Sequence, residues 1–462
     1  GYFRNRIIEH FFALKGGFKM EINLSEHFTY SKLIRFTFPT IIMMIFTSIY
    51  GVVDGLFVSN VVGSDAFASI NLIMPAIMIV GTIGFMIGTG GSALVSKTLG
   101  EGDAKKANNY FSMLVFLEII LGAIFMILGL FILEPVAKLL GADETMMSDC
   151  LPYGRILLLG TVPFILQNSF QSFVIVVEKP KFGLAISIIT GVTNMILDFV
   201  FIYLLNFGVA GAATATIISQ FVGSIIPLVY FIKENDTVLR LHWTKFELTP
   251  IIDSCINGSS EMVTNLSMSL INILFNKQLM DMVGADGVSA YGVIMYVGFL
   301  FVGTYVGYSL GSAPVISYHY GANNKDELKS LLKKSVRLLG IVAIVMTVLA
   351  EILARPLASI FVGYDEELLN ITINALRLYS ISYFVSWFNI FASSFFTALN
   401  NGFVSAFISF LRTLFFQVIT ILILPKIWGI DGIWLSVLVA EVLSLVVSIS
   451  CFAINKKKYE YI

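Results

Sequence analysis

Charged residues are scarce in this chain, and so are the residues from which catalytic and metal centres are usually built. Asp, Glu, Lys and Arg make up 13% of the 462 residues, whereas an average soluble domain carries about 25%. The three cysteines and four histidines are scattered, with no two at metal-ligand spacing. A net charge of -1 offers nothing to attract nucleic acid. These shortages exclude a soluble enzyme, a nucleic-acid binder and a disordered chain, and they predict no cofactor.

Apolar residues are correspondingly abundant. They form 57% of the chain, and the mean hydropathy is +0.87. A membrane-spanning helix needs about 20 mostly apolar residues. We therefore predict an all-α integral membrane protein in the lipid bilayer, with twelve transmembrane helices. The runs lie at 33–58, 66–96, 108–133, 151–175, 183–206, 210–232, 251–276, 287–318, 331–354, 372–397, 403–425 and 431–454.

Basic residues are divided unequally between the two sets of loops. One set, together with the C-terminal tail, carries 16 Lys and Arg residues, and the alternate set carries four. Loops rich in Lys and Arg remain in the cytoplasm. The sequence therefore predicts a multi-pass protein of the cell membrane with both termini cytoplasmic.

An internal repeat relates the two halves of the chain. At an offset of 221 residues, Gly90, Ser96 and Gly100 coincide with Gly311, Ser317 and Gly321. Six helices per half place the two copies in the same orientation, related by a pseudo-two-fold axis along the membrane normal. The predicted divisions are a segment upstream of the first Met (1–19), an N-terminal six-helix lobe (20–232), a cytoplasmic linker (233–249), a C-terminal six-helix lobe (250–455) and a cytoplasmic tail (456–462).

Ionisable residues inside membrane spans are functional candidates because burying them is costly. Asp54 in the first helix and Asp198 in the fifth lie at similar predicted depths, level with Thr216 in the sixth. Asn194 precedes Asp198 by four residues and shares its helix face. These oxygens suit Na⁺, and two close carboxylates would equally hold a proton. The second copy lacks both acids, so the fold does not require them.

The motif Tyr50-Gly-Val-Val-Asp54, preceded by Pro39, resembles the first helix of the multidrug and toxic compound extrusion (MATE) family, as does Asn194-Met-Ile-Leu-Asp198 in the fifth helix. This resemblance implies an antiporter that exports organic cations in exchange for H⁺ or Na⁺. It also implies a coupling site at Asp54, Asn194, Asp198 and Thr216, a substrate cavity shared with Tyr50, and a kink at Pro39.

Glu261 is a secondary candidate, because some family members carry a working acid on the seventh helix. It sits about two turns earlier than that acid and close to the inner end of the helix, so we predict a gating or packing role. Cationic amphipathic molecules are the expected cargo, and a monomer is the expected form. The alternative is a flippase for lipid-linked saccharides, which shares the architecture. The acidic N-terminal site favours the antiporter. The sequence leaves the choice between H⁺ and Na⁺ open.

Overall fold

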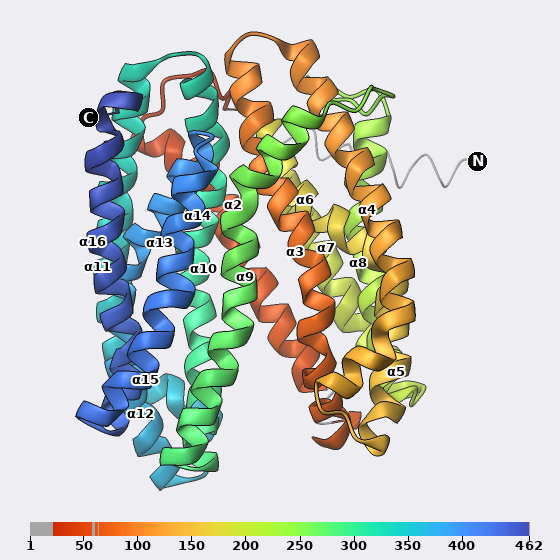
Figure 1. Ribbon diagram of the computed structural model, residues 1–462, viewed down its shortest axis with the longest axis vertical. Coiled ribbons are helices and arrows are strands. Elements are labelled where there is room, and N and C mark those ends of the chain that lie inside the picture. The colour runs from red at the N-terminus through yellow and green to blue at the C-terminus, as the bar shows by residue number, and fades with distance from the viewer. Residues whose placement is uncertain (1–21, 58–60, 63, 462) are drawn as a thin grey trace.

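A computed structural model describes residues 22–57, 61–62 and 64–461, and these residues form helices joined by short turns (Figure 1). The predicted segment 1–19 lies outside the described residues. The first half contains α2 (Tyr30–Phe57), α3 (Ser64–Gly100), α4 (Ala104–Leu139), α5 (Glu144–Leu159), α6 (Thr161–Val176), α7 (Pro180–Asp198), the π-helix η3 (Phe199–Leu204) and α8 (Gly208–Ile232).

The second half follows the same order after a non-helical connection. Its helices are α9 (Leu248–Met282), α10 (Ala285–Gly321), α11 (Lys325–Val362), α12 (Glu366–Ser380), α13 (Tyr383–Ala398), α14 (Gly402–Phe410), the π-helix η4 (Leu411–Phe415), α15 (Phe416–Trp428) and α16 (Ile430–Tyr459).

These elements form the twelve predicted spans. Within the described residues, nine helices are long and apolar enough to cross a membrane alone, and the pair α5/α6, bent by 58°, makes a tenth. The remaining two predicted spans correspond to α9 and the interrupted pair α12/α13. The fold class predicted from the sequence is therefore confirmed.

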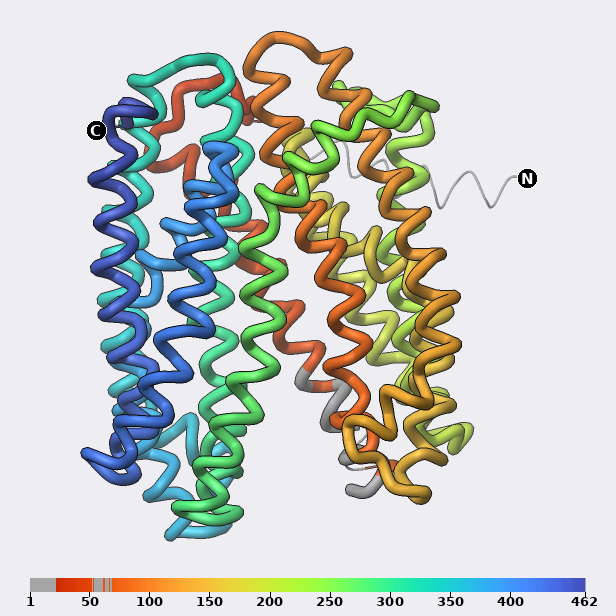
Figure 2. The backbone as a smooth tube through the Cα atoms, viewed as in Figure 1, coloured from red at the N-terminus to blue at the C-terminus, as the bar shows by residue number. Residues whose placement is uncertain are grey.

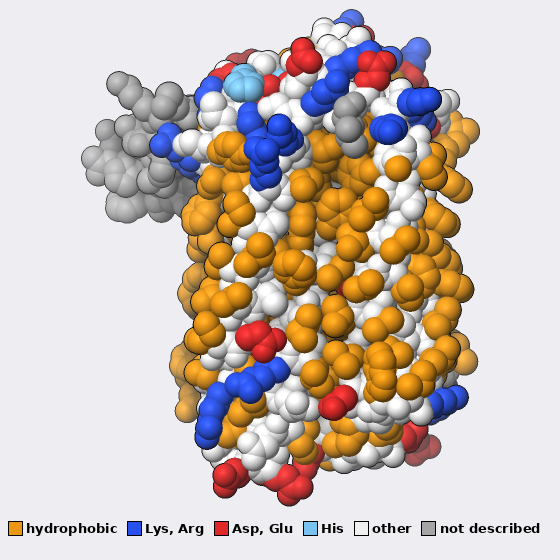
Figure 3. Space-filling view, turned by 90° about the vertical axis from the view of Figure 1, so that its left-hand side faces the viewer, with side chains coloured by type: hydrophobic (Ala, Val, Ile, Leu, Met, Phe, Trp, Pro, Cys, Tyr) orange, Lys and Arg blue, Asp and Glu red, His pale blue; other side chains and the backbone are white. Residues whose placement is uncertain are grey.

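The two halves form two helix bundles standing side by side (Figure 2). The bundles approach each other at the end where the described termini lie, here called the termini end, and diverge towards the opposite end. On the face shown in Figure 3, apolar side chains cover the middle of the molecule, and Lys and Arg side chains gather at the termini end. This distribution is that of a multi-pass membrane protein.

The internal repeat reappears as a two-fold contact between the lobes. A Cβ on Gly100 of α3 would lie 2.0 Å from the carbonyl oxygen of Tyr318, and a Cβ on Gly321 of α10 would lie 1.9 Å from that of Lys97. Lys97 and Tyr318 are themselves separated by the repeat offset. Glycine is required at both positions because the two backbones touch. Two contacts related by the repeat, Gly100 with Tyr318 and Gly321 with Lys97, thus close the termini end.

Candidate functional site

Helix α7 carries a buried polar stripe along one face. Ser187, Thr190, Asn194 and Asp198 recur every three or four residues, which keeps them on one side of an α-helix. All four are buried, and the side chain of Asp198 is 0% exposed. The α-helical hydrogen bonding ends at Asp198, and the π-helix η3 follows directly. π-turns within helices occur often at functional sites.

Helix α2 lies against this stripe. A Cβ on Gly191 would come within 2.6 Å of the Phe46 ring and 3.0 Å of the Tyr50 ring. Tyr50 is therefore packed beside α7, one turn before Asn194. Asp54 lies in α2 one turn beyond Tyr50, but its side chain falls outside the described residues. Pro39 lies inside α2, which continues as a helix on both sides of it.

Helix α8 runs antiparallel to α7 and brings Thr216 to the level of the acid. A Cβ on Gly211 of α8 would lie 3.1 Å from the backbone of Phe201. A Cβ on Gly223 would lie 2.7 Å from Thr190 Oγ1. Between these two crossings Thr216 comes level with residues 196–198. Its Oγ1 donates a hydrogen bond to the Ala212 carbonyl oxygen at 3.0 Å. Asn194 and Asp198 of α7 therefore lie between α2, which carries Tyr50, and α8, which carries Thr216.

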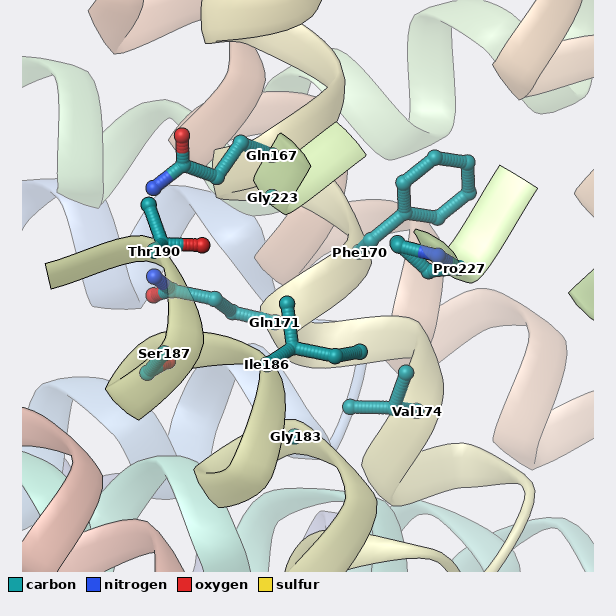
Figure 4. A pocket seen from close by; sticks show the side chains of 10 residues that line it. All are labelled: Gln167, Phe170, Gln171, Val174, Gly183, Ile186, Ser187, Thr190, Gly223 and Pro227. Atoms are coloured by element: carbon teal, nitrogen blue, oxygen red, sulfur yellow. The ribbon is translucent and has the colours of Figure 1, made fainter. Parts of the chain in front are cut away.

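A small cavity with a partly polar, mainly apolar wall lies beside the first part of the stripe (Figure 4). It lies between α6, α7 and α8, and the polar part of its wall consists of Gln167, Gln171, Ser187 and Thr190. Within the described residues, Gln167 Oε1 and Thr190 Oγ1 are buried without a hydrogen-bond partner. In Figure 4 the amide group of Gln167 lies beside the Thr190 side chain. The N-terminal lobe therefore offers neutral oxygen atoms about two turns along α7 from its buried acid.

The second lobe buries an acid together with a base. Arg412 in η4 donates from Nε to both carboxylate oxygens of Glu441 at 2.9 and 3.1 Å. Asn389 Nδ2 donates to Glu441 Oε2 at 2.7 Å, and Ser448 Oγ donates to Asn389 Oδ1 at 2.8 Å. The sequence places Arg412 in the apolar run 403–425 and Glu441 in the run 431–454. It gave no signal that they pair, because they lie on different helices.

Glu261 lies in α9 near this pair. The helix begins at Leu248, so Glu261 lies about 20 Å along its axis. This is further into the helix than the inner-end position expected from the sequence. Its side chain is partly buried and lies in the electrostatic field of Arg412. The C-terminal cluster is therefore two acids around one arginine, unlike the N-terminal site.

The segment before α2 fastens the two lobes together at the termini end. The backbone N–H of Phe28 donates to Glu327 Oε1 of α11 at 2.9 Å, and His27 contacts the other carboxylate oxygen. Lys334 of α11 donates to the Phe28 carbonyl oxygen. In the first lobe, Glu178 accepts a hydrogen bond from the Leu24 N–H at 2.6 Å. Residues 24–28 thus bridge α11 and the turn after α6.

Known membrane proteins resemble this chain in sequence. The sequence model of the MatE family matches residues 39–200 and 261–423, one match in each lobe. The multidrug export protein MepA of Staphylococcus saprophyticus is 24% identical over 358 residues, which is 76% of this chain and 79% of that protein. MepA of Staphylococcus aureus is 22% identical over 362 residues, covering 77% and 80% of the two chains.

Solved structures share the fold. A crystal structure of MATE in complex with MaL6 superposes with a TM-score of 0.89 at 22% identity, covering 94% of this chain and 98% of that one. An outward-facing multidrug resistance MATE family transporter of the MOP superfamily gives 0.88 at 21% identity, with the same coverage. At these identities the likeness concerns the fold alone.

Proposed function

Because this chain belongs to the MatE family, we propose that it is a transporter that exports cationic amphipathic molecules in exchange for H⁺ or Na⁺. The observation that carries the proposal is the burial of Asp198 where α7 changes from an α-helix to the π-helix η3. Asp198 belongs to one of two lobes that are related by the internal repeat. Burial disfavours the ionised form of a carboxyl group, and a bound proton or cation offsets that cost. The relatives named multidrug export proteins support the class of cargo.

The two lobes, 20–232 and 250–455, are the moving parts in this proposal, and the termini end faces the cytoplasm. The positive charge at that end supports this orientation. The contacts at Gly100 and Gly321 close the cytoplasmic side, while the bundles diverge towards the outside. The arrangement corresponds to an outward-open state of an alternating-access carrier working as a monomer.

Ion and cargo compete for the N-terminal lobe in the proposed cycle. Asp54 and Asp198 attract a cationic molecule when they are ionised. Binding of H⁺ or Na⁺, assisted by Asn194 and Thr216, neutralises them and releases the molecule outside. The neutral oxygens of Gln167 and Thr190 extend the site towards the cytoplasm. Exchange requires that ion and cargo bind the two states with different free energy.

Dye efflux from vesicles under an imposed Na⁺ or H⁺ gradient tests this proposal and identifies the ion. We expect Asp198→Asn to insert normally but to lose ion-driven efflux and ion-induced displacement of bound dye. Asp149→Asn, at a position outside the proposed site in α5, is the matched control and should retain both. If Asp198→Asn still releases dye when the ion is added, the shared-site mechanism is wrong.

A further inference from the structure

Glu118 is a buried acid that the proposed cycle does not use. It lies in α4, and its side chain is 0% exposed. Both carboxylate oxygens lack a hydrogen-bond partner among the described residues. Its polar neighbour is Ser169 of α6, also 0% exposed, and the two face each other without a hydrogen bond of ordinary geometry.

No basic side chain in the described part of the molecule compensates Glu118. Helix α6 carries no titratable residue. The charged residues of α3, Asp65 and Lys97, lie near its two ends. Arg155 of α5 lies near Glu134, in the opposite half of α4. A lone carboxylate in such surroundings is strongly disfavoured, and the neutral acid takes its place.

The connection between the lobes packs against the part of α4 that precedes Glu118, on a different face of the helix. The connection between the lobes runs along this helix: Asn108 Oδ1 accepts from the Arg240 N–H at 2.8 Å, and Ser112 Oγ accepts from the His242 N–H at 3.2 Å. One turn further, the rings of Phe116 and Trp243 lie 5.4 Å apart.

The end of the connection and the first turns of α9 lie near this part of α4. The Glu247 N–H, just before α9, contacts Met113 Sδ at 3.2 Å, and the thiol of Cys255 lies in the electrostatic field of Glu118. The neighbouring residue Ser254 touches α3, since a Cβ on Gly90 would lie 2.0 Å from its carbonyl oxygen. The interface between α3 and α9 thus lies beside the acid, and opening it at the termini end would bring water towards Glu118.

We propose that Glu118 is a proton-binding site linked to closure of the termini end. When the lobes close, the carboxyl group is dehydrated and must hold a proton. When they open, water stabilises the carboxylate and the proton leaves to that side. By linkage, a state that binds a proton more tightly is favoured by acid. Acidification of the termini side therefore favours the closed, outward-open state. The inference rests on the alternating access proposed above.

Other titratable groups near the path must be separated from Glu118. They are Cys255 on α9, His242 and Glu247 on the connection, and Asp198 in the same lobe. The Asp198→Asn background removes the coupling acid. Replacing the native cysteines by alanine removes the thiol, and His242 and Glu247 remain unchanged in every variant compared.

Distances between spin labels on cysteines placed at Lys105 and Lys329 would report the closed and open populations across pH. In the Asp198→Asn, cysteine-free background we expect the ratio of closed to open to rise on acidification, by up to about tenfold per pH unit, the limit for one linked proton. Glu118→Gln, which mimics the neutral acid, should remain closed and change by less than about twofold. Glu118→Asp, which retains a carboxyl group, should recover the dependence.

Glu134→Gln is the matched control, because Glu134 is an exposed acid on the same helix, paired with Lys138. It should behave as its parent. If Glu118→Gln keeps the full pH dependence, or is fixed in the open state, the inference is wrong. Failure of the antiport proposal would appear separately, as absence of ion-driven dye efflux by the unmodified protein.

Discussion

The two lobes differ in how their buried acidic side chains are neutralised. The N-terminal lobe buries Asp198 and Glu118, and in the described part of the chain no basic residue lies beside Glu118. The C-terminal lobe instead neutralises Glu441 with Arg412. The first arrangement favours binding of a cation or proton. In the second arrangement the guanidinium group of Arg412 takes the place of a bound cation. Hydrogen bonds from Asn389 to Glu441 and from Ser448 to Asn389 hold the carboxylate in position.

Removing one member of the Arg412–Glu441 pair should destabilise the protein strongly. Arg412→Gln leaves a buried carboxylate, and such changes cost about 3–5 kcal/mol. The double variant Arg412→Gln/Glu441→Gln leaves no unpaired charge and should recover most of that loss. Thermal unfolding of the purified protein in detergent measures both. Equal destabilisation by the single and double variants would show that the charge pair is not the cause.

At the scale of elements, close helix crossings decide which side is shut. Helices α3 and α9 meet where a Cβ on Gly258 would lie 1.8 Å from the Met86 carbonyl oxygen. The segment 24–28 adds polar contacts from both lobes. Closure is therefore achieved by backbone contact, which a single added side chain can prevent.

Gly258→Leu should shift the protein away from the closed termini end, because no side chain fits between α3 and α9. A thiol-specific cross-linker between cysteines at Lys97 and Tyr320, in a background without native cysteines, would measure the loss as a lower cross-linked fraction. Gly292→Leu is the control, since a Cβ there meets nothing within 4 Å. An unchanged yield in Gly258→Leu would contradict the role of this crossing.

On the scale of the whole molecule, charge and shape agree on one orientation. The end that is rich in Lys and Arg is the end where the bundles meet (Figures 2 and 3). Membrane insertion retains such loops in the cytoplasm. The carrier is therefore expected to be shut on the cytoplasmic side in this state.

Reporter fusions test this orientation. Green fluorescent protein joined after residue 462 should fluoresce in the cytoplasm, and alkaline phosphatase at the same position should be inactive. Alkaline phosphatase inserted at Tyr364, in the turn between α11 and α12 at the opposite end, should be active. The reverse pattern would invert the topology and the direction of export.

The sequence alone predicted the twelve helices, the repeat and the polar face of α7. These properties are local or periodic: a run of about 20 apolar residues, an offset of 221, and a spacing of four between Asn194 and Asp198. The family resemblance drew on the same short motifs. Such features need no knowledge of which helices are neighbours.

Only the tertiary structure decided how distant residues meet. It joined Arg412 of a π-helix to Glu441 of α16, and it brought Thr216 level with the end of α7. It also packed the first half of α4 against a connection that begins more than one hundred residues later. It also decided that the lobes touch at the termini end. These outcomes depend on the packing of helices that belong to different parts of the chain, and sequence patterns within one helix do not encode that packing.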